Sequence, residues 1–174
     1  EGDLHISFEM TRNDESDYGN TLLYMYAQGV GEAPYAKDIT EWSEARSIPA
    51  MSKYFTNMNL LSLSFRKNLR ARRYPLRNAD RDKEPVGGTV FPHVDYIGMI
   101  PGKTYVVNVK KQGASLNLHL SDKETGEVYA EHTWDMRKVS SEKGDAPVLT
   151  KGRIGLRHMS TKQFTYKNFK VVQL

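Results

Sequence analysis

The sequence predicts an all-β fold, a two-sheet antiparallel β-sandwich of the jelly-roll type. Apolar and polar residues alternate in about eight short segments, which is the pattern of half-buried strands. Turn-forming residues separate these segments, and no segment carries the apolar repeat of a long helix. A length of 174 residues suits one domain, so we expect residues 1–174 to form a single jelly-roll domain.

The first half of the chain carries strands that we expect at residues 4–11, 21–28 and 57–66. In the second of these strands, Leu23 and Met25 fall on one face of the sheet. Tyr24 and Tyr26 fall on the opposite face, because successive side chains of a strand alternate.

Two long stretches at residues 29–56 and 67–102 interrupt the strands and are rich in glycine and proline. We expect a short helical turn near residues 40–46 in the first stretch. Loops of this length are usually functional or disordered, so both stretches are candidates for carrying a site.

The second half of the chain predicts a meander with strands at residues 104–111, 115–121 and 127–134. A last hairpin at residues 153–159 and 164–172 completes the expected sandwich.

The net charge of +4 is mild, but its distribution is uneven. Five basic residues fall between positions 66 and 73, and Arg77 follows closely. Such a cluster favours an anionic partner, which can be nucleic acid, phosphate or an acidic sugar chain. The alternative is a solvated basic loop with no partner.

Composition also limits the class of protein. Cysteine is absent, which excludes disulfides, thiolate metal sites and a cysteine nucleophile. No apolar run reaches the roughly 18 residues of a membrane-spanning helix, so we expect no membrane partner. The chain opens at Glu1 without a signal peptide, and we expect a trimmed fragment that lacks an N-terminal strand. Zero cysteine leaves the compartment open, and we favour a periplasmic or secreted protein.

Familiar catalytic and metal motifs are missing, including a phosphate-binding glycine loop, a nucleophile elbow and a paired-histidine zinc motif. We therefore expect no cofactor and no metal. A glycoside hydrolase needs two carboxylates across a cleft, and Glu9 and Glu131 on strand faces are the candidates for that alternative.

Polar strand faces instead indicate a sugar-binding groove. A concave jelly-roll sheet that binds sugar presents aromatic rings, amides and arginines at alternate strand positions. Tyr24 and Tyr26 fit this pattern, and we expect Asn117 and His119 to line the same groove. The alternative is an ordinary solvent-facing sheet on which tyrosines fill space.

The C-terminal run Pro147–Met159, followed by Tyr166–Val171, resembles the YesU-like family of concanavalin-type jelly rolls. The segment Met58–Arg66 is similar to that family's central strand, in which Asn59 is the characteristic residue. Tyr74–Arg77 resembles the segment that follows. The likeness extends from Leu4 to Val172 and implies a concanavalin-like jelly roll.

The resemblance also implies a substrate class. YesU-like proteins occur with uronate- and rhamnose-containing polysaccharides, and a similar jelly roll is associated with dehydration of ulvan oligosaccharides. The chain departs from the family where relatives carry histidines, because Tyr54 and Ser62 stand at those positions. A role for histidine there is therefore not carried over.

The implied chemistry is β-elimination at a uronate. Arginine or asparagine beside the carboxylate stabilises the enolate-like intermediate, and a histidine or tyrosine removes the C5 proton. The candidates for this catalytic acid and base are His93, Tyr54 and Tyr96. The expected substrate-binding residues are Arg66, Arg77, Asn59, Tyr24, Tyr26, His119 and Arg157.

Two main functions therefore remain open. The first is a carbon–oxygen lyase or dehydratase that acts on uronate-containing oligosaccharides of the ulvan or rhamnogalacturonan type. The second is a non-catalytic carbohydrate-binding jelly roll, and a glycoside hydrolase is a further alternative. In each case we expect an acidic oligosaccharide partner rather than nucleic acid.

Overall fold

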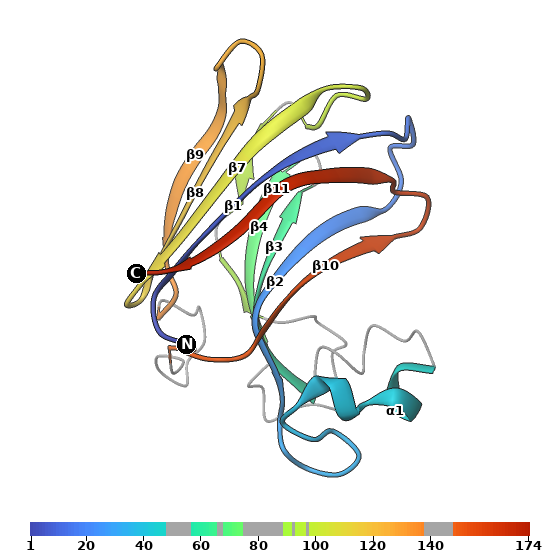
Figure 1. Cartoon of the computed structure of the whole chain (residues 1–174), viewed down its shortest axis with the longest axis vertical. Helices are drawn as coiled ribbons and strands as arrows, with labels where there is room; N and C mark the ends of the chain where they lie inside the picture. The colour runs from blue at the N-terminus through green and yellow to red at the C-terminus, as the bar shows by residue number, and fades with distance from the viewer. Residues whose placement is uncertain (48–56, 66–67, 75–88, 92, 97, 138–147) are drawn as a thin grey trace.

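The structure is a computed structural model that describes residues 1–47, 57–65, 68–74, 89–91, 93–96, 98–137 and 148–174. Two antiparallel sheets pack face to face in this part of the chain (Figure 1). Sheet A has the strand order β11-β1-β7-β8-β9. Its strands are β1 (Leu4–Arg12), β7 (Thr104–Gln112), β8 (Ser115–Asp122), β9 (Val128–Asp135) and β11 (Phe164–Gln173).

Sheet B has the order β10-β2-β3-β4-β5, and β6 pairs with β4 on the same side as β5. Its strands are β2 (Asn20–Gly29), β3 (Met58–Phe65), β4 (Asn68–Tyr74), β5 (Thr89–Val90), β6 (Val94–Asp95) and β10 (Arg153–Met159). A 3-10 helix η1 (Ile39–Glu41) and a short helix α1 (Ser43–Ser47) follow β2. The predicted all-β sandwich is thus confirmed.

The structure contains the strand β4 within residues 67–102, where the sequence predicts one irregular stretch. Leu69 and Ala71 of this strand are buried against the other sheet, whereas Arg70 and Arg72 lie on its outer face. Because three of its seven residues are arginines, the strand has the composition of a basic loop. The expected helical turn near residues 40–46 is present as η1 and α1.

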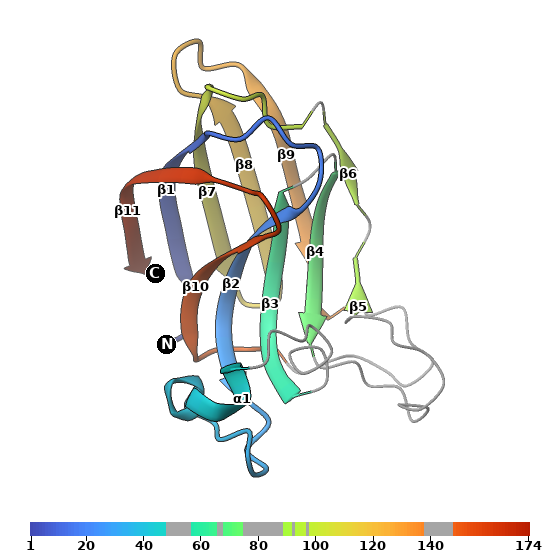
Figure 2. The same ribbon diagram turned by 90° about the vertical axis from the view of Figure 1, so that its right-hand side faces the viewer.

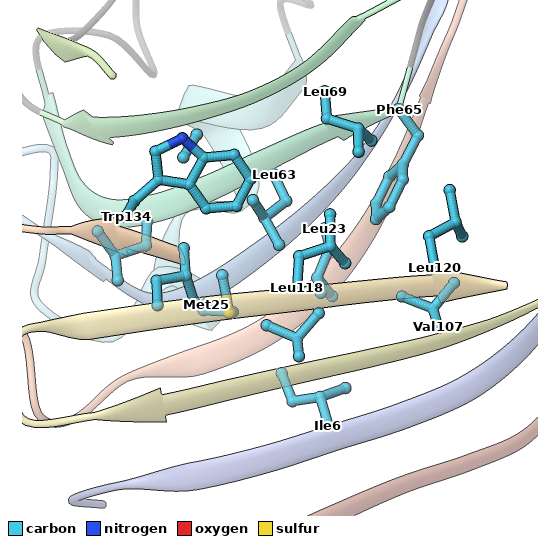
Figure 3. Packing of buried hydrophobic residues seen from close by; sticks show 14 of the residues in the cluster. Ile6, Leu23, Met25, Leu63, Phe65, Leu69, Val107, Leu118, Leu120 and Trp134 are labelled. Atoms are coloured by element: carbon cyan, nitrogen blue, oxygen red, sulfur yellow. The ribbon is translucent and has the colours of Figure 1, made fainter. Parts of the chain in front are cut away.

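The main core lies between the two sheets and is built from the inward-facing residues that alternate along the strands (Figure 3). Sheet A contributes side chains such as Ile6, Val107 and Leu118, none of which is exposed to solvent. Sheet B contributes Leu23 and Leu63 from the facing strands. Full burial of one such side chain stabilises the fold by about 1.5–3 kcal/mol. Because the apolar residues alternate along each strand, this free energy is gained only when the apolar faces of the two sheets pack against each other.

A bulge in β2 shifts the alternation of its side chains after Met25, so that Met25 and Tyr26 both face the main core. Ala27 lies opposite Arg153 and Tyr24 opposite Gly155, so β2 holds one more residue than β10 over this span. The extra residue is accommodated at Tyr26, whose φ of 56° is in the left-handed region. Alternation alone did not reveal this bulge, because an inserted residue leaves the apolar pattern on either side intact.

A buried ionic cluster joins the end of β1 to the turn between β10 and β11. The Asp14 carboxylate lies 2.9 Å from Lys162 Nζ and 3.3 Å from the Arg12 guanidinium, and all three side chains are at most 10% exposed. The backbone N–H of Gln163 donates to the second Asp14 oxygen at 2.9 Å. The carboxylate is therefore fully engaged, and the cluster fixes how the two sheets meet at this end.

Within the described residues, no helix has the length and apolar character needed to cross a membrane.

Candidate functional site

Two rows of side chains cross the outer face of sheet B, each running over four neighbouring strands. In the first row, Gly155 of β10 lies opposite Tyr24 of β2, followed by Ser62 of β3 and Arg72 of β4. The second row is displaced by two residues along each strand. It consists of Arg157, Leu22, Ser64 and Arg70, in the same strand order.

Both sheets bend in the same direction, so that the outer face of sheet B is its concave side (Figure 1). Figure 2 shows this face with β10, β2, β3 and β4 side by side. We call the two rows the concave face. Neighbouring strands are about 4.8 Å apart, so the backbones of β10 and β4 are separated by roughly 14 Å.

Arginines lie on the two outer strands of the concave face, β10 and β4, and tyrosines lie next to them. Arg157 Nη1 donates to the Tyr24 hydroxyl oxygen at 3.5 Å, across β10 and β2. Burial raises the pKa of the Tyr74 phenol above its usual value, although Arg72 and Arg157 act on it in the opposite direction. Both guanidiniums thus lie close enough to influence the Tyr74 phenol. The electrostatic potential of the concave face near Tyr74 is therefore positive.

Small polar residues form the middle of the concave face. Ser62 and Ser64 are 2% and 6% exposed, so their neighbours largely cover them. The amide of Asn20 donates to the Ser64 hydroxyl oxygen at 2.7 Å. The longer tyrosine and arginine side chains, which are half-buried, therefore provide the surface that a ligand meets.

One end of the concave face is bounded by residues 30–44, which we call the wall segment. Its side chains Tyr35, Ile39 and Trp42 pack on the outer face of sheet B in a second hydrophobic cluster. This cluster also includes Tyr74 and Tyr24 of the sheet. The part of the first long stretch that the structure describes is therefore packed onto the sheet beside the rows.

The wall segment is held by polar contacts as well. Asp38 Oδ2 lies 2.9 Å from Arg153 Nη2, an ion pair between the segment and β10. The backbone N–H of Gly29 donates to Lys37 at 3.0 Å, and Trp42 Nε1 donates to the carbonyl of Ala36 at 2.7 Å. The two rows themselves contain no acidic residue. The rows contain three arginines, and the carboxylate of Asp38 beside them is already paired with Arg153. The net charge of the rows is therefore positive.

The structure brings together two of the residues that the sequence predicted for binding, Tyr24 and Arg157. The expectation that Tyr26 shares their face is wrong, because the bulge turns Tyr26 inward. Its side chain is 1% exposed, its hydroxyl donates to the carbonyl of Gly2 at 2.8 Å, and Lys111 Nζ lies 5.1 Å from its ring centre.

His119 and Asn117 do not line the same groove as Tyr24, because they belong to sheet A. His119 is on the outer face of β8, with Nδ1 3.8 Å from a Glu131 carboxylate oxygen. Asn59 lies near the start of β3, opposite Gln28 of β2, and is half-buried.

The proposed acid–base residues are not grouped with the arginines in the described part of the chain. His93 is half-exposed beside β6, with Nε2 3.6 Å from Asp95. Tyr96 packs against the main core, and burial, together with Tyr105, raises the pKa of its phenol. Tyr54, Arg66 and Arg77 lie outside the described residues.

Three residues at or beside the concave face were not among the site residues predicted from the sequence, namely Arg70, Arg72 and Tyr74. The signal that predicts them is the alternation of Leu69 and Ala71 with the two arginines, which identifies a strand within the basic cluster. No group of three or more potential metal ligands occurs among the described residues.

Comparison with solved structures relates this chain to several proteins over nearly its whole length. The carbohydrate-binding module CBM66 from Bacillus subtilis matches with a TM-score of 0.50 and 11% identity, over 98% of this chain and 75% of that one. Sheep galectin-11 in complex with glycerol matches with a TM-score of 0.51 and 5% identity, over 99% and 91%. The exoplasmic/lumenal domain of VIP36 bound to Ca²⁺ and Man3GlcNAc matches with a TM-score of 0.52 and 9% identity, over 99% and 70%.

No family model and no curated protein matches the sequence. The comparisons thus give no support to membership of the YesU-like family or to a likeness to the ulvan dehydratase. At these low identities the likeness concerns the fold alone. The chain is a concanavalin-like jelly-roll β-sandwich, as the sequence predicted.

Proposed function

We propose that the concave face of sheet B binds an acidic oligosaccharide without changing it chemically. The observation that carries this proposal is the arrangement of the two rows, with guanidiniums on both sides of Tyr24 and serines between them. Guanidinium groups bind carboxylates through charge-assisted and often bidentate hydrogen bonds. Tyrosine offers an apolar ring and a hydroxyl together, which suits the two kinds of surface on a sugar.

The fold likeness supports carbohydrate as the class of ligand. One similar structure is named a carbohydrate-binding module, and another holds Man3GlcNAc. The acidic character rests on the arginines of this chain, since each row ends in an arginine on β4 and Arg157 lies on the opposite side.

Two of the tyrosines of this chain are poorly suited to act as a catalytic base. A tyrosine that acts as a base needs its pKa lowered towards neutrality. Burial has the opposite effect on Tyr74 and Tyr96, because it raises the pKa of both phenols. These two tyrosines are therefore protonated at neutral pH and do not take up a proton from a substrate.

A second candidate function is the elimination of a uronate substituent, as the lyase interpretation of the sequence requires. It is favoured by the contact between Arg157 and the Tyr24 hydroxyl, since a neighbouring cation stabilises a phenolate. An assay for the ultraviolet absorbance of an unsaturated uronate separates this candidate from simple binding.

Calorimetric titration with oligogalacturonate and other uronate oligosaccharides tests the binding proposal. Loss of one charge-assisted contact costs about 1.5–3 kcal/mol, so Arg157→Ala should weaken binding about tenfold to a hundredfold. Lys110→Ala is the matched control, because Lys110 is an exposed cation of β7 in sheet A. It should bind as the wild type does.

The ligand provides a second control. Carboxyl-reduced forms of the same oligosaccharides keep the sugar rings but lose the negative charge, and they should bind much more weakly. If no uronate oligosaccharide binds, or if Arg157→Ala and Lys110→Ala lose affinity equally, the proposal is wrong.

A further inference from the structure

Gly155 occupies a place on the concave face where every other strand of the row presents a side chain. It lies directly opposite Tyr24 on β10, an edge strand of sheet B. Arg153 and Arg157 precede and follow it on the same face, because side chains two residues apart in a strand point the same way. The backbones of these two arginines are about 13 Å apart along the strand.

The space above Gly155 is open. A β-carbon added to Gly155 would meet no described atom within 4 Å beyond its chain neighbours. An aromatic residue opposite an edge glycine commonly folds over it and fills this space. Tyr24 does not fill it, since none of its atoms lies within 4 Å of that position, and its hydroxyl instead accepts a hydrogen bond from Arg157 Nη1 at 3.5 Å.

The flanking arginine on the other side is also held away from Gly155. Arg153 Nη2 is paired with Asp38 Oδ2 of the wall segment at 2.9 Å. One arginine is therefore directed to the wall segment and the other to Tyr24. Between them lies a notch with the backbone of Gly155 as its floor and Tyr24 at its side.

Neither backbone conformation nor close packing accounts for glycine at this position. The φ of Gly155 is outside the left-handed region, so an L-residue can adopt it without strain. The contrast with Gly152 on the same side of the molecule is clear, since Gly152 has a φ of 141° and packs against the backbone of Tyr26. Glycine also weakens a strand interior relative to other residues.

We propose that Gly155 is a specificity-determining residue, which leaves room for one sugar ring of the acidic oligosaccharide between Arg153 and Arg157. In this subsite the ring lies beside Tyr24, and its carboxylate reaches Arg157. The inference rests on the proposed function and adds the position and size of a single subsite. A side chain at position 155 fills the notch and excludes the sugar without disturbing the fold.

The test is a size series at position 155, comprising Gly155→Ala, Gly155→Val and Gly155→Leu. Unfolding temperatures should be unchanged or raised, because a strand residue with a side chain replaces glycine in open space. Affinity for the uronate oligosaccharide that binds the wild type should fall stepwise with side-chain size. The Val variant should lose roughly tenfold or more, which corresponds to about 1.4 kcal/mol.

Leu156→Val is the matched control, because Leu156 is the next residue of the same edge strand and points to the opposite face. It should bind as the wild type does. If the folded Val and Leu variants bind as tightly as the wild type while Arg157→Ala binds weakly, the subsite is wrong and the proposed function stands. If the wild type binds no uronate oligosaccharide, the proposed function itself fails. If the Val or Leu variant does not fold, the Gly155→Ala variant still tests the proposal. A fully stable Ala variant that binds as tightly as the wild type would contradict a subsite that fits one sugar ring closely.

Discussion

Asp38 Oδ2 and Arg153 Nη2 form an ion pair of 2.9 Å that joins the wall segment to β10 at the border of the concave face. The two residues are 115 positions apart in the sequence, so the contact exists only in the folded protein. Asp38 also accepts hydrogen bonds from the backbone N–H and the hydroxyl of Thr40, at 3.0 and 2.8 Å. The same carboxylate thus caps η1 and fixes the wall segment to the sheet.

The first prediction concerns acid release of the wall segment. The hydrogen bonds from Thr40, followed by that from Arg153, lower the pKa of Asp38 to about 2 from an ordinary 3.8. Because the pKa is lowered in the folded protein, Asp38 takes up a proton more readily in the unfolded form. The stability that Asp38 contributes is therefore complete above pH 3.8 and is lost as the pH falls towards 2. The indole N–H signal of Trp42, followed by NMR, should report this transition. In Asp38→Asn the transition should disappear, whereas Glu131→Gln in sheet A should leave it unchanged.

The second prediction concerns Gly29, the last residue of β2. A β-carbon there would meet the backbone of Tyr35 and Ala36, which passes directly over the glycine. Gly29→Ala should therefore displace the wall segment and cost about 1–3 kcal/mol, the usual range for overpacking. Gly155→Ala is the control in thermal unfolding, because its added methyl group meets open space. Equal stability of the two variants would contradict the packing described for the wall segment.

The third prediction concerns the buried carboxylate of Asp14. Burial alone would raise its pKa, but the hydrogen bonds from Gln163 and Lys162 and the charges of Lys162 and Arg12 lower it overall. Its contribution to stability is therefore present above pH 3.8 and is lost at lower pH. Asp14→Asn should destabilise the protein by about 1–3 kcal/mol in chemical unfolding at pH 7. Asp17→Asn, at an exposed neighbouring carboxylate, should stay within about 0.5 kcal/mol of the wild type. A result in which both variants are equally stable would show that the cluster contributes nothing.

The fourth prediction concerns ionic strength. The Debye length falls from about 30 Å at 0.01 M salt to about 3 Å at 1 M, so attraction between the arginines and an acidic sugar should weaken over this range. Affinity measured by calorimetry should decrease steadily with added salt for a uronate oligosaccharide. An affinity independent of salt would indicate that the arginines do not contact the acidic groups of the ligand.

The fold was predictable from the sequence because strand alternation is a local property. The segment of β8, in which Leu116, Leu118 and Leu120 are all buried, could be assigned from its residues alone. The site was predictable only in part. Tyr24 was assigned to the correct face, but Tyr26 was not, because a bulge shifts the alternation without changing the residue types around it. The pairing of Tyr24 with Gly155 depends on strand order, which connects residues more than a hundred positions apart.

The central claim is that an acidic oligosaccharide binds across the two rows of sheet B, and mapping of backbone NMR shifts during titration with oligogalacturonate tests it most directly. The account predicts that the largest changes occur at Gly155, Tyr24, Ser62 and Arg72, which lie on four adjacent strands. Signals from the outer face of sheet A, such as those of His119 and Asn117, should remain unchanged. Changes concentrated on sheet A, or an absence of changes in β10 and β2 at saturating ligand, would contradict it.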